Sequence, residues 1–304
     1  MALDREGANS SPRRVVIVTG AGKGLGRAFA IACAQQGDAV IVNNRRREGE
    51  SDSAKNVVDE IRALGGAAVA ERSDVTALEA PQGLLDAALS NFGRLDAVIL
   101  NAGVAGAPDF FGKVAAEKFD HVIETNFNAQ VRLVRTFLPV LKTAPAGRLV
   151  FIASSAGMYG MRGGAAYSAS KGAVIAFASA LAAENRKSPL RVNTLAPYAE
   201  TRMTHDTVTG EIAERFSPQA AAAPAAWLAS EDCRQTGQLW VAGAGQLRHA
   251  RMVEAATEAF SGSLPVPIAG IEMHPETTMS TYDDAERAFA DFVARTEENA
   301  KPTP

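Results

Sequence analysis

The stretch VVIVTGAGKGLGRAFAIACAQQG, residues 15–37, joins a short β-branched run to a Gly-rich turn and then to a helical pattern. The run predicts a strand from Val15 to Thr19, and the apolar period predicts a helix from Leu25 to Gln36, closed by Gly37. Glycines in the turn would let the backbone approach a diphosphate lying on the helix N-terminus. The order strand, glycines, helix therefore predicts a dinucleotide site, with an ordinary Gly-rich turn as the alternative.

Short β-branched runs alternate with longer helical patterns through most of the chain. This rhythm is typical of βαβ units, which build a parallel sheet covered on both faces. We therefore predict an α/β fold with a doubly wound, seven-stranded parallel sheet, Rossmann-like, with helices on both faces and a C-terminal appendage. Seven runs are expected to form the strands: Val15 to Thr19, Ala39 to Asn43, Ala67 to Arg72, Asp96 to Asn101, Arg148 to Ser154, Arg191 to Ala196 and Gln238 to Val241.

The rhythm stops near both ends of the chain. Residues 1–13 are polar and have no period, which predicts a disordered arm. The dinucleotide-binding catalytic domain is expected at 14–246 and a C-terminal extension at 247–304. That extension contains a Pro-rich stretch at 264–279 and, we predict, an amphipathic helix at 282–296.

Composition and charge narrow the choice of partners. The chain of 304 residues has a formal net charge of -3 and a pI near 5.9, so it lacks the basic excess that nucleic acids attract. We see no apolar signal segment and no run that spans a membrane, and we expect a cytoplasmic protein without membrane contact. The four histidines, at 121, 205, 249 and 274, share no ligand spacing, so no metal is expected.

Two further motifs stand at the ends of expected strands. Asp74 and Val75 follow the third strand, where the carboxylate would either reach the amino group of an adenine or cap the next helix. Asn101-Ala102-Gly103 ends the fourth strand, at the edge where open α/β sheets bind ligands. An ordinary strand-to-loop turn is the alternative for that motif.

Four polar residues suggest acid–base chemistry. Tyr167 and Lys171 are four residues apart, so in the first turns of a helix they share one face. A tyrosine hydroxyl is a poor base near neutral pH, but a neighbouring ammonium favours the phenolate. Ser154 ends the fifth strand, where its hydroxyl would polarise a carbonyl or serve in a turn. Asn126 lies in an apolar helical pattern, where its amide is either functional or a satisfied core group.

Taken in order, these motifs resemble the short-chain dehydrogenase/reductase family over roughly residues 13–246. Thr19 to Gly26 match its Thr-Gly-x-x-x-Gly-x-Gly motif, and Asn101 to Gly103 match its Asn-Ala-Gly motif. The catalytic tetrad of the family is matched by Asn126, Ser154, Tyr167 and Lys171. Within the family, the stretches at 154–160, 195–204 and 241–245 look similar to the hydroxyacyl-CoA dehydrogenase domain of type-2 multifunctional β-oxidation enzymes. Tyr198 departs from the pattern, because many relatives have Gly there.

The resemblance implies a role for each matched residue. Tyr167 would exchange the hydroxyl proton, Lys171 would lower the pKa of Tyr167 and hold the nicotinamide ribose, and Ser154 would orient the carbonyl. Asn126 would anchor a water that links Lys171 to solvent. The segment from Ala199 to Ala223 would be a mobile substrate lid. Motifs and resemblance together assign these cofactor contacts: Thr19, Gly20, Lys23, Gly24, Leu25, Gly26, Asn44, Arg45, Asp74, Val75, Asn101, Ala102, Gly103, Tyr167, Lys171, Pro197 and Thr201.

The end of the second strand predicts which nicotinamide cofactor is preferred. An acidic side chain there would grip both ribose hydroxyls of NAD, but this chain has the uncharged Asn44. Arg45 follows with a planar fork suited to a 2′-phosphate, and Lys23 adds a second positive charge. We therefore expect NADP to be preferred and NAD to remain possible. The alternative is that residues 45–47 form a solvated loop and that Lys23 serves the diphosphate of either cofactor.

The expected function is hydride transfer between a nicotinamide cofactor and a secondary alcohol or ketone. The substrate could be a 3-hydroxyacyl-CoA, a hydroxysteroid or another alicyclic alcohol, and the loop at 104–113 would help to select it. A catalytically silent dinucleotide sensor or scaffold is the alternative. Family relatives pair through the helices that carry Asn126 and Tyr167, which implies a homodimer or homotetramer.

Overall fold

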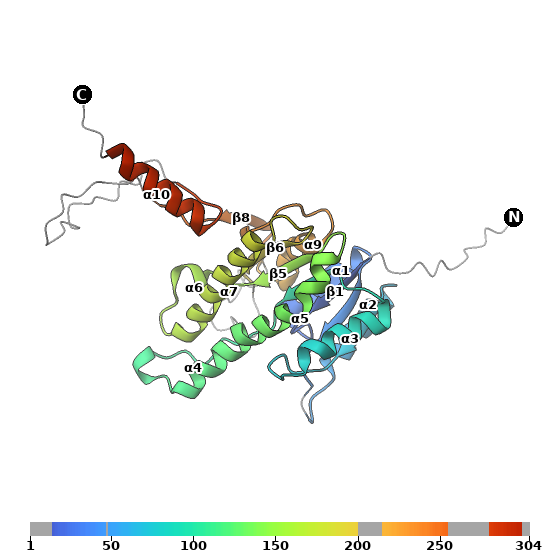
Figure 1. Cartoon of the computed structure of the whole chain (residues 1–304). Coiled ribbons are helices and arrows are strands. Elements are labelled where there is room, and N and C mark those ends of the chain that lie inside the picture. Colours follow the sequence, from blue (N-terminus) through green and yellow to red (C-terminus); the bar gives the residue numbers. More distant parts are fainter. Residues whose placement is uncertain (1–13, 47, 200–214, 255–279, 300–304) are drawn as a thin grey trace. The chain divides into compact units, whose positions relative to one another are not determined.

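The computed structural model describes residues 14–46, 48–199, 215–254 and 280–299 (Figure 1). The chain divides after His249 into two units, Met1–His249 and Ala250–Pro304. The arm predicted at 1–13 and the Pro-rich stretch at 264–279 lie outside the described residues.

The first unit is built on one eight-stranded sheet with the order β3-β2-β1-β4-β5-β6-β7-β8. Strands β1 to β7 pair in parallel with their neighbours, and the order reverses between β1 and β4. This reversal creates a switch point, where ligands bind in open α/β sheets. The strands are β1 Val15–Val18, β2 Ala39–Asn43, β3 Ala68–Glu71, β4 Ala97–Leu100, β5 Arg148–Ile152, β6 Arg191–Pro197, β7 Leu239–Gly243 and β8 Gln246–Ala250.

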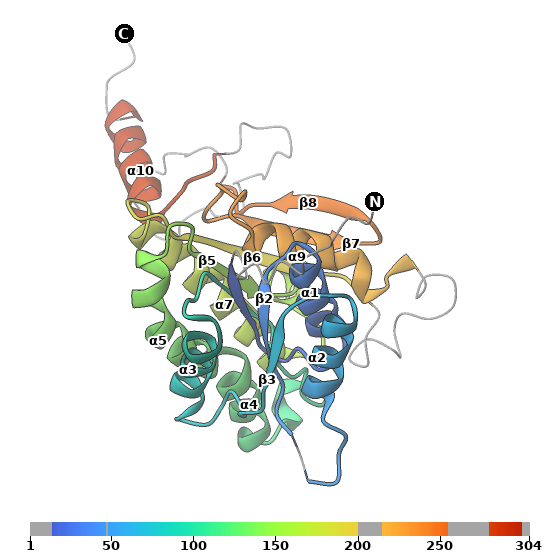
Figure 2. The same ribbon diagram turned by 90° about the vertical axis from the view of Figure 1, so that its right-hand side faces the viewer.

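Helices cover both faces of the sheet, as Figure 2 shows. Alternation along β1 explains why: Val16 and Val18 face the core that includes Phe29, while Ile17 faces the core that includes Phe137. One face therefore carries α1, α2 and α9, and the other carries α3, α5 and α7. The helices of this unit are α1 Gly24–Gln35, α2 Ser53–Ala63, α3 Ala80–Phe92, η1 Phe111–Lys113, α4 Ala116–Ile123, η2 Glu124–Asn128, α5 Ala129–Thr143, α6 Ser155–Tyr159, α7 Ala165–Glu184, η3 Pro218–Ala221 and α9 Ala222–Ala229.

The predicted doubly wound α/β fold is confirmed, and all seven predicted strands form with each end at most two residues from the expected bound. The strand count needs one correction, because β8 adds an eighth strand beside β7. The two-residue turn between them, Ala244 and Gly245, has φ values of 49° and 72°, which suits a tight antiparallel hairpin. Edge strand β8 was not predicted because its exposed sequence, QLRHA, has no apolar run.

The second unit contains α10, Ala285–Asn299, close to the predicted helix at 282–296. Tyr282 stands just before this helix and donates a hydrogen bond from its hydroxyl to Asp291 at 2.6 Å. Before it, Glu254 and Ser280 form an isolated antiparallel bridge.

Candidate active site

A cavity of about 1260 Å³ lies at the carboxyl ends of the parallel strands, beside the switch point. Its wall brings together most of the residues that the sequence singled out, although they come from the ends of six strands and from helix α7. Thr19 and Asn126 are buried outside the lining, and Thr201 lies outside the described residues. The predicted residues in the wall are Gly20, Lys23, Gly24, Leu25, Gly26, Asn44, Arg45, Asp74, Val75, Asn101, Ala102, Gly103, Ser154, Tyr167, Lys171 and Pro197.

The Gly-rich turn packs so closely that side chains would not fit. A Cβ at Gly20, whose φ is +63°, would lie 2.9 Å from the Cα of Ala102. A Cβ at Gly26 would lie 2.3 Å from the carbonyl oxygen of Gly20. The following helix, α1, begins after Lys23, which makes no side-chain cap. The first N–H groups of α1 therefore remain available for an anion, as a dinucleotide site needs.

Thr19 and Asn101 fasten the Gly-rich turn to the end of β4. The Thr19 Oγ1 accepts hydrogen bonds from the backbone N–H groups of Asn101 and Ala102, both at 3.0 Å. In return, the Asn101 side-chain amide donates to the Thr19 carbonyl oxygen at 2.9 Å. Thr19 therefore positions the motifs that line the cavity, instead of lining the cavity itself.

One end of the cavity, which we define by Asn44, Arg45, Ser53 and Asp74, holds an ion pair. Arg45 Nη1 lies 2.8 Å from Asp74 Oδ2, and the Asn44 amide donates to Ser53 Oγ at 2.8 Å. Burial favours the protonated form of Asp74, but hydrogen bonds from Arg45 and Thr76 outweigh burial and lower the pKa of Asp74. Sequence reasoning placed Arg45 and Asp74 here separately and missed their pairing, because no spacing rule relates residues after different strands.

Tyr167 is the third residue of α7, as the Tyr-x-x-x-Lys spacing requires. Ser154 caps α6, where its Oγ accepts the N–H of Ala156 at 3.2 Å, and its side chain also hydrogen-bonds Tyr167. Burial raises the pKa of Tyr167, and the hydrogen bond from Ser154 offsets only part of this rise. Tyr167 is therefore protonated near neutral pH in the free chain.

Lys171 lies one turn after Tyr167 on α7 and is buried. Its Nζ donates to the carbonyl oxygen of Ile152 at 2.7 Å and lies 5.9 Å from the centroid of the Tyr167 ring. Burial lowers the pKa of Lys171 to about 8. The ammonium thus remains charged at neutral pH, close enough to influence the Tyr167 hydroxyl.

Asn126 stands in η2, a π-helical turn between α4 and α5. Such turns often mark functional sites within helices. The Asn126 amide donates to the Val104 carbonyl at 2.9 Å and to Ser170 Oγ at 3.0 Å, while its oxygen accepts the Val104 N–H at 2.7 Å. These bonds tie the loop after β4 to α7, so they fit the core-amide alternative, and a water anchored by Asn126 stays a prediction.

Three exposed apolar side chains also line the cavity and were not assigned as site residues from the sequence. Tyr159, Met161 and Tyr198 have relative exposures of 79%, 46% and 47%. Tyr198 packs against Gly243, where an added Cβ would lie 2.8 Å from the Tyr198 Cβ. Large exposed apolar groups gathered at a cavity mark ligand-binding surface. Only the departure from Gly at position 198 signalled any of them in the sequence.

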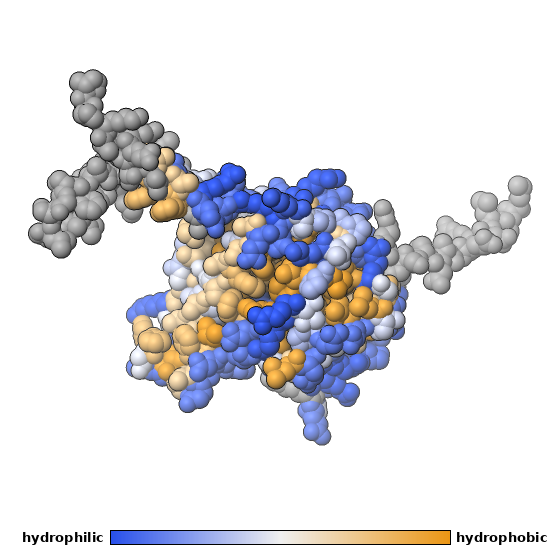
Figure 3. Space-filling view, in the orientation of Figure 1, coloured by the Kyte–Doolittle hydropathy of each residue, from blue (hydrophilic) through white to orange (hydrophobic). Residues whose placement is uncertain are grey.

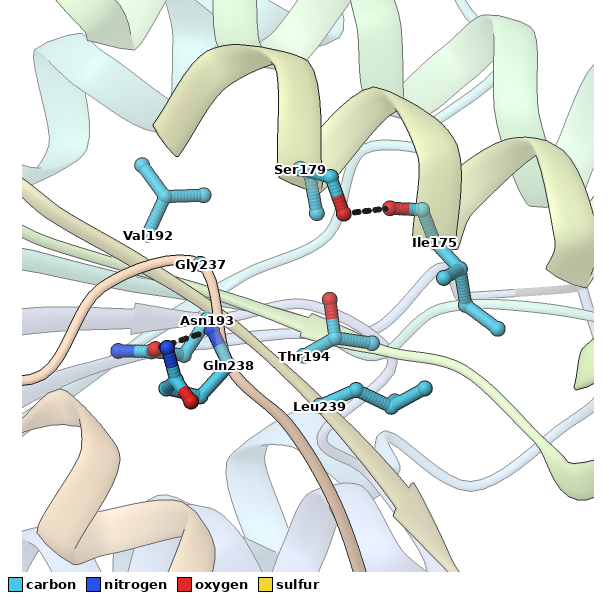
Figure 4. A pocket seen from close by; sticks show the side chains of 9 residues that line it. Ile175, Ser179, Val192, Asn193, Thr194, Gly237, Gln238 and Leu239 are labelled. Atoms are coloured by element: carbon cyan, nitrogen blue, oxygen red, sulfur yellow. Dashed lines mark hydrogen bonds between the residues drawn. The ribbon is translucent and has the colours of Figure 1, made fainter. Parts of the chain in front are cut away.

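Figure 4 shows a second, much smaller pocket between α7 and residues 237–239, lined in part by Ile175 and Val192. Its volume of about 10 Å³ would hold a single water at most. It is therefore no substrate site. Within the described part of the chain, no group of His, Cys, Asp and Glu side chains could hold a metal ion.

Comparisons with known proteins agree with this geometry. Residues 14–211 match the family model for short chain dehydrogenase. The chain is 38% identical over 237 residues to peroxisomal multifunctional enzyme type 2 of Mus musculus, covering 76% of this chain but only 32% of the mouse protein. It is 34% identical over 240 residues to a short-chain type dehydrogenase/reductase of Mycobacterium tuberculosis, covering 77% of this chain and 84% of that protein.

Two solved structures are also similar. A short chain dehydrogenase from Mycobacterium avium superposes with a TM-score of 0.72 at 30% identity and covers 95% of this chain and 96% of its own. A 7α-hydroxysteroid dehydrogenase, complexed with NADH and 7-oxo glycochenodeoxycholic acid, has a TM-score of 0.69 at 29% identity, covering 77% of this chain and 94% of its own. On the family model, the relatives and the cavity together, the chain belongs to the short-chain dehydrogenase family of oxidoreductases.

Proposed function

We propose that this chain interconverts a secondary alcohol and a ketone and prefers NADP(H) as its cofactor. The observation that carries the proposal is one cavity whose wall holds both the Gly-rich turn and the group Ser154, Tyr167 and Lys171. A silent sensor or scaffold needs only the first of these. Because Ser154, Tyr167 and Lys171 are all present and line the same cavity as the Gly-rich turn, we favour the enzyme.

The residues present fit a dinucleotide. Close packing at Gly20 and Gly26 leaves no room for side chains in the turn, and the N-terminus of α1 carries no side-chain cap, so its N–H groups can meet a diphosphate. Lys23 and Gly24 would hold the diphosphate, and Lys171 would hold the nicotinamide ribose. When bound, the nicotinamide gives or takes a hydride.

The proton is handled by the chain itself. In ketone reduction, Ser154 orients the carbonyl oxygen, and Tyr167 donates its hydroxyl proton to that oxygen. The raised pKa of Tyr167 keeps this proton in place near neutral pH. The charge of Lys171 then stabilises the phenolate that remains on Tyr167. In alcohol oxidation the same groups act in reverse.

Three side chains support the preference for NADP(H). Asn44 is uncharged and would not repel a 2′-phosphate, and Arg45 and Lys23 line the cavity as positive charges. NAD(H) would use the same site with fewer charge contacts. We expect Arg45→Leu to weaken NADPH binding about tenfold, as for the loss of one charge-assisted hydrogen bond, and to leave NADH binding nearly unchanged.

The apolar residues of the cavity, Tyr159, Met161 and Tyr198, suit a substrate with an apolar body. Similar proteins act on such compounds: one is named cyclohexanol dehydrogenase from Acinetobacter, 31% identical over 232 residues. We therefore propose an alicyclic or hydroxyacyl alcohol. The test is an assay of cyclic ketones, steroid ketones and ketoacyl-CoA thioesters, each with NADPH and with NADH. Turnover is measured as the loss of absorbance of the reduced nicotinamide. If none of these compounds is reduced with either cofactor, the proposed function is contradicted.

We also propose that the chain forms a homodimer or homotetramer in the cytoplasm. Helix α7 is long and largely apolar in composition, yet only 33% of its most apolar window is buried within the chain. Figure 3 shows apolar surface over α7 and beside α5.

By length and composition α7 could also cross a membrane, which the sequence expectation overlooked. The buried Lys171 and the packing of Val174 and Ala178 in the core instead favour a second copy as the cover.

A further inference from the structure

The Arg45–Asp74 ion pair stands where a 2′-phosphate would be recognised. Both side chains line the cavity, and their exposed fractions are 37% and 34%. The guanidinium that the proposed function assigns to the phosphate therefore already has an anionic partner. A second anion entering this end of the cavity would have to displace Asp74 or share Arg45 with it.

Asp74 is a firmly held competitor. Its Oδ1 accepts the Thr76 N–H at 3.0 Å and the Thr76 hydroxyl at 2.8 Å, which leaves Oδ2 for Arg45 at 2.8 Å. The carboxylate is fixed by the turn after β3, so it would not swing away when a ligand arrives. Its pKa lies below the usual value, which keeps it charged at neutral pH.

The side-chain amides of Asn44 and Asn43 do not replace Asp74 as a partner of the Arg45 guanidinium. Asn44 directs its amide to Ser53 Oγ and to the Arg45 carbonyl oxygen, and it carries no charge. Asn43 is turned the other way, toward Glu71 Oε2 at 2.6 Å and the Ser73 carbonyl at 3.0 Å.

We propose that Asp74 sets the cofactor preference by competing with a 2′-phosphate for Arg45. The proposal rests on the proposed function, in which Arg45 meets that phosphate. NAD(H) leaves the pair intact, whereas NADP(H) must break or share it and also meets the negative charge of Asp74. Asn44, Arg45 and Lys23 favour NADP(H) over NAD(H). Asp74 reduces this difference in affinity.

Asp74→Asn tests this with little change of shape. The asparagine keeps an oxygen for Thr76 and for an adenine amino group, but it loses the charge that holds Arg45. Kd values for NADPH and NADH would be measured by nucleotide fluorescence titration in the wild type, Asp74→Asn, Arg45→Leu and the double variant. Asp59→Asn is the matched control, since it removes a charge paired with Lys55 on α2, outside the cavity wall.

We expect Asp74→Asn to improve NADPH binding relative to NADH by about tenfold, which corresponds to ~1.4 kcal/mol. In the Arg45→Leu background the same change should alter the ratio of the two Kd values clearly less than in the wild type, because only the direct repulsion between Asp74 and the phosphate is then left to relieve. Asp59→Asn should leave the ratio unaltered. Arg45→Leu could weaken NADPH binding while Asp74→Asn changes the Kd values of NADPH and NADH by the same factor. That result would overturn the proposed role of Asp74 and leave the NADP(H) proposal standing. If Arg45→Leu does not affect NADPH, both proposals fall.

Discussion

At the scale of single residues, burial shifts the pKa values of two neighbouring groups in opposite directions. It raises that of Tyr167 and lowers that of Lys171 to about 8. Each shift favours the neutral form of its group, because a charged group loses hydration when buried. Near neutral pH, Tyr167 therefore holds its proton while Lys171 is still charged, and this combination suits reduction of a ketone.

The pH profile of ketone reduction follows from these shifts. Reduction needs the proton on Tyr167 and the charge on Lys171, and Lys171 loses its charge as the pH rises through about 8. We expect kcat/KM for reduction to be level below that pH and to fall above it. The check is kcat/KM measured across a pH series with saturating NADPH. A value that rises through the pKa of Lys171 would contradict these roles.

The sequence was enough to predict which residues belong to the site, because they lie in motifs. It was not enough to predict which of these residues contact one another. Tyr167 and Lys171 share a helix face by spacing alone. The contacts of Arg45 with Asp74 and of Asn126 with Val104 join residues from separate strand ends or helices. Such contacts depend on the register of the sheet, which a single sequence does not specify residue by residue.

At the scale of elements, α6 and α7 are held in contact by Gly157. A Cβ there would lie 2.6 Å from the backbone carbon of Lys171, so α6 approaches α7 almost to backbone contact. Ser154 caps α6 and Tyr167 lies in α7, so this approach sets the distance between the two hydroxyls. Gly157, which lies in the stretch 154–160 that carries part of the resemblance, thus supports the geometry of the reaction.

Gly157→Ala should separate the two helices. We expect a loss of about 1–3 kcal/mol in the free energy of unfolding, typical of overpacking, together with a lower kcat. Gly83→Ala, within α3, is the control: its nearest neighbour is 3.7 Å away, so it should stabilise by about 0.5–1 kcal/mol through helix propensity. Urea unfolding and steady-state kinetics check both. If Gly157→Ala and Gly83→Ala change the free energy of unfolding and kcat to the same extent, the role given to Gly157 is refuted.

Most elements were predictable because their periods are strong, and the exceptions have physical causes. Helices α1 and α2 and strands β1 to β7 lie where apolar periodicity placed them. Strand β8 is exposed and needs no apolar run, and the π-helical turn η2 inserts into an otherwise regular helical pattern. A helical period of 3.6 residues does not reveal one inserted residue.

At the scale of the whole molecule, we expect copies of the chain to meet at the outward face of α7. Ala169, Ala176 and Ala180 are exposed there, and such small side chains permit close approach of a second helix. We expect Ala176→Arg to lower the mass measured by light scattering from that of an oligomer to that of one chain. Ala63→Arg, at the exposed end of α2, should leave the mass unchanged. A monomeric wild type would end the proposal of a homo-oligomer.

The central claim is that the whole chain is an oxidoreductase whose proton passes through Tyr167. The most direct test compares the wild type with Tyr167→Phe, in turnover of a ketone and in NADPH affinity measured by fluorescence. We predict that the variant loses at least about 100-fold in kcat, the usual minimum for acid–base catalysis, while the Kd for NADPH stays within about twofold. Retention of more than about a tenth of the wild-type rate by Tyr167→Phe would contradict the claim.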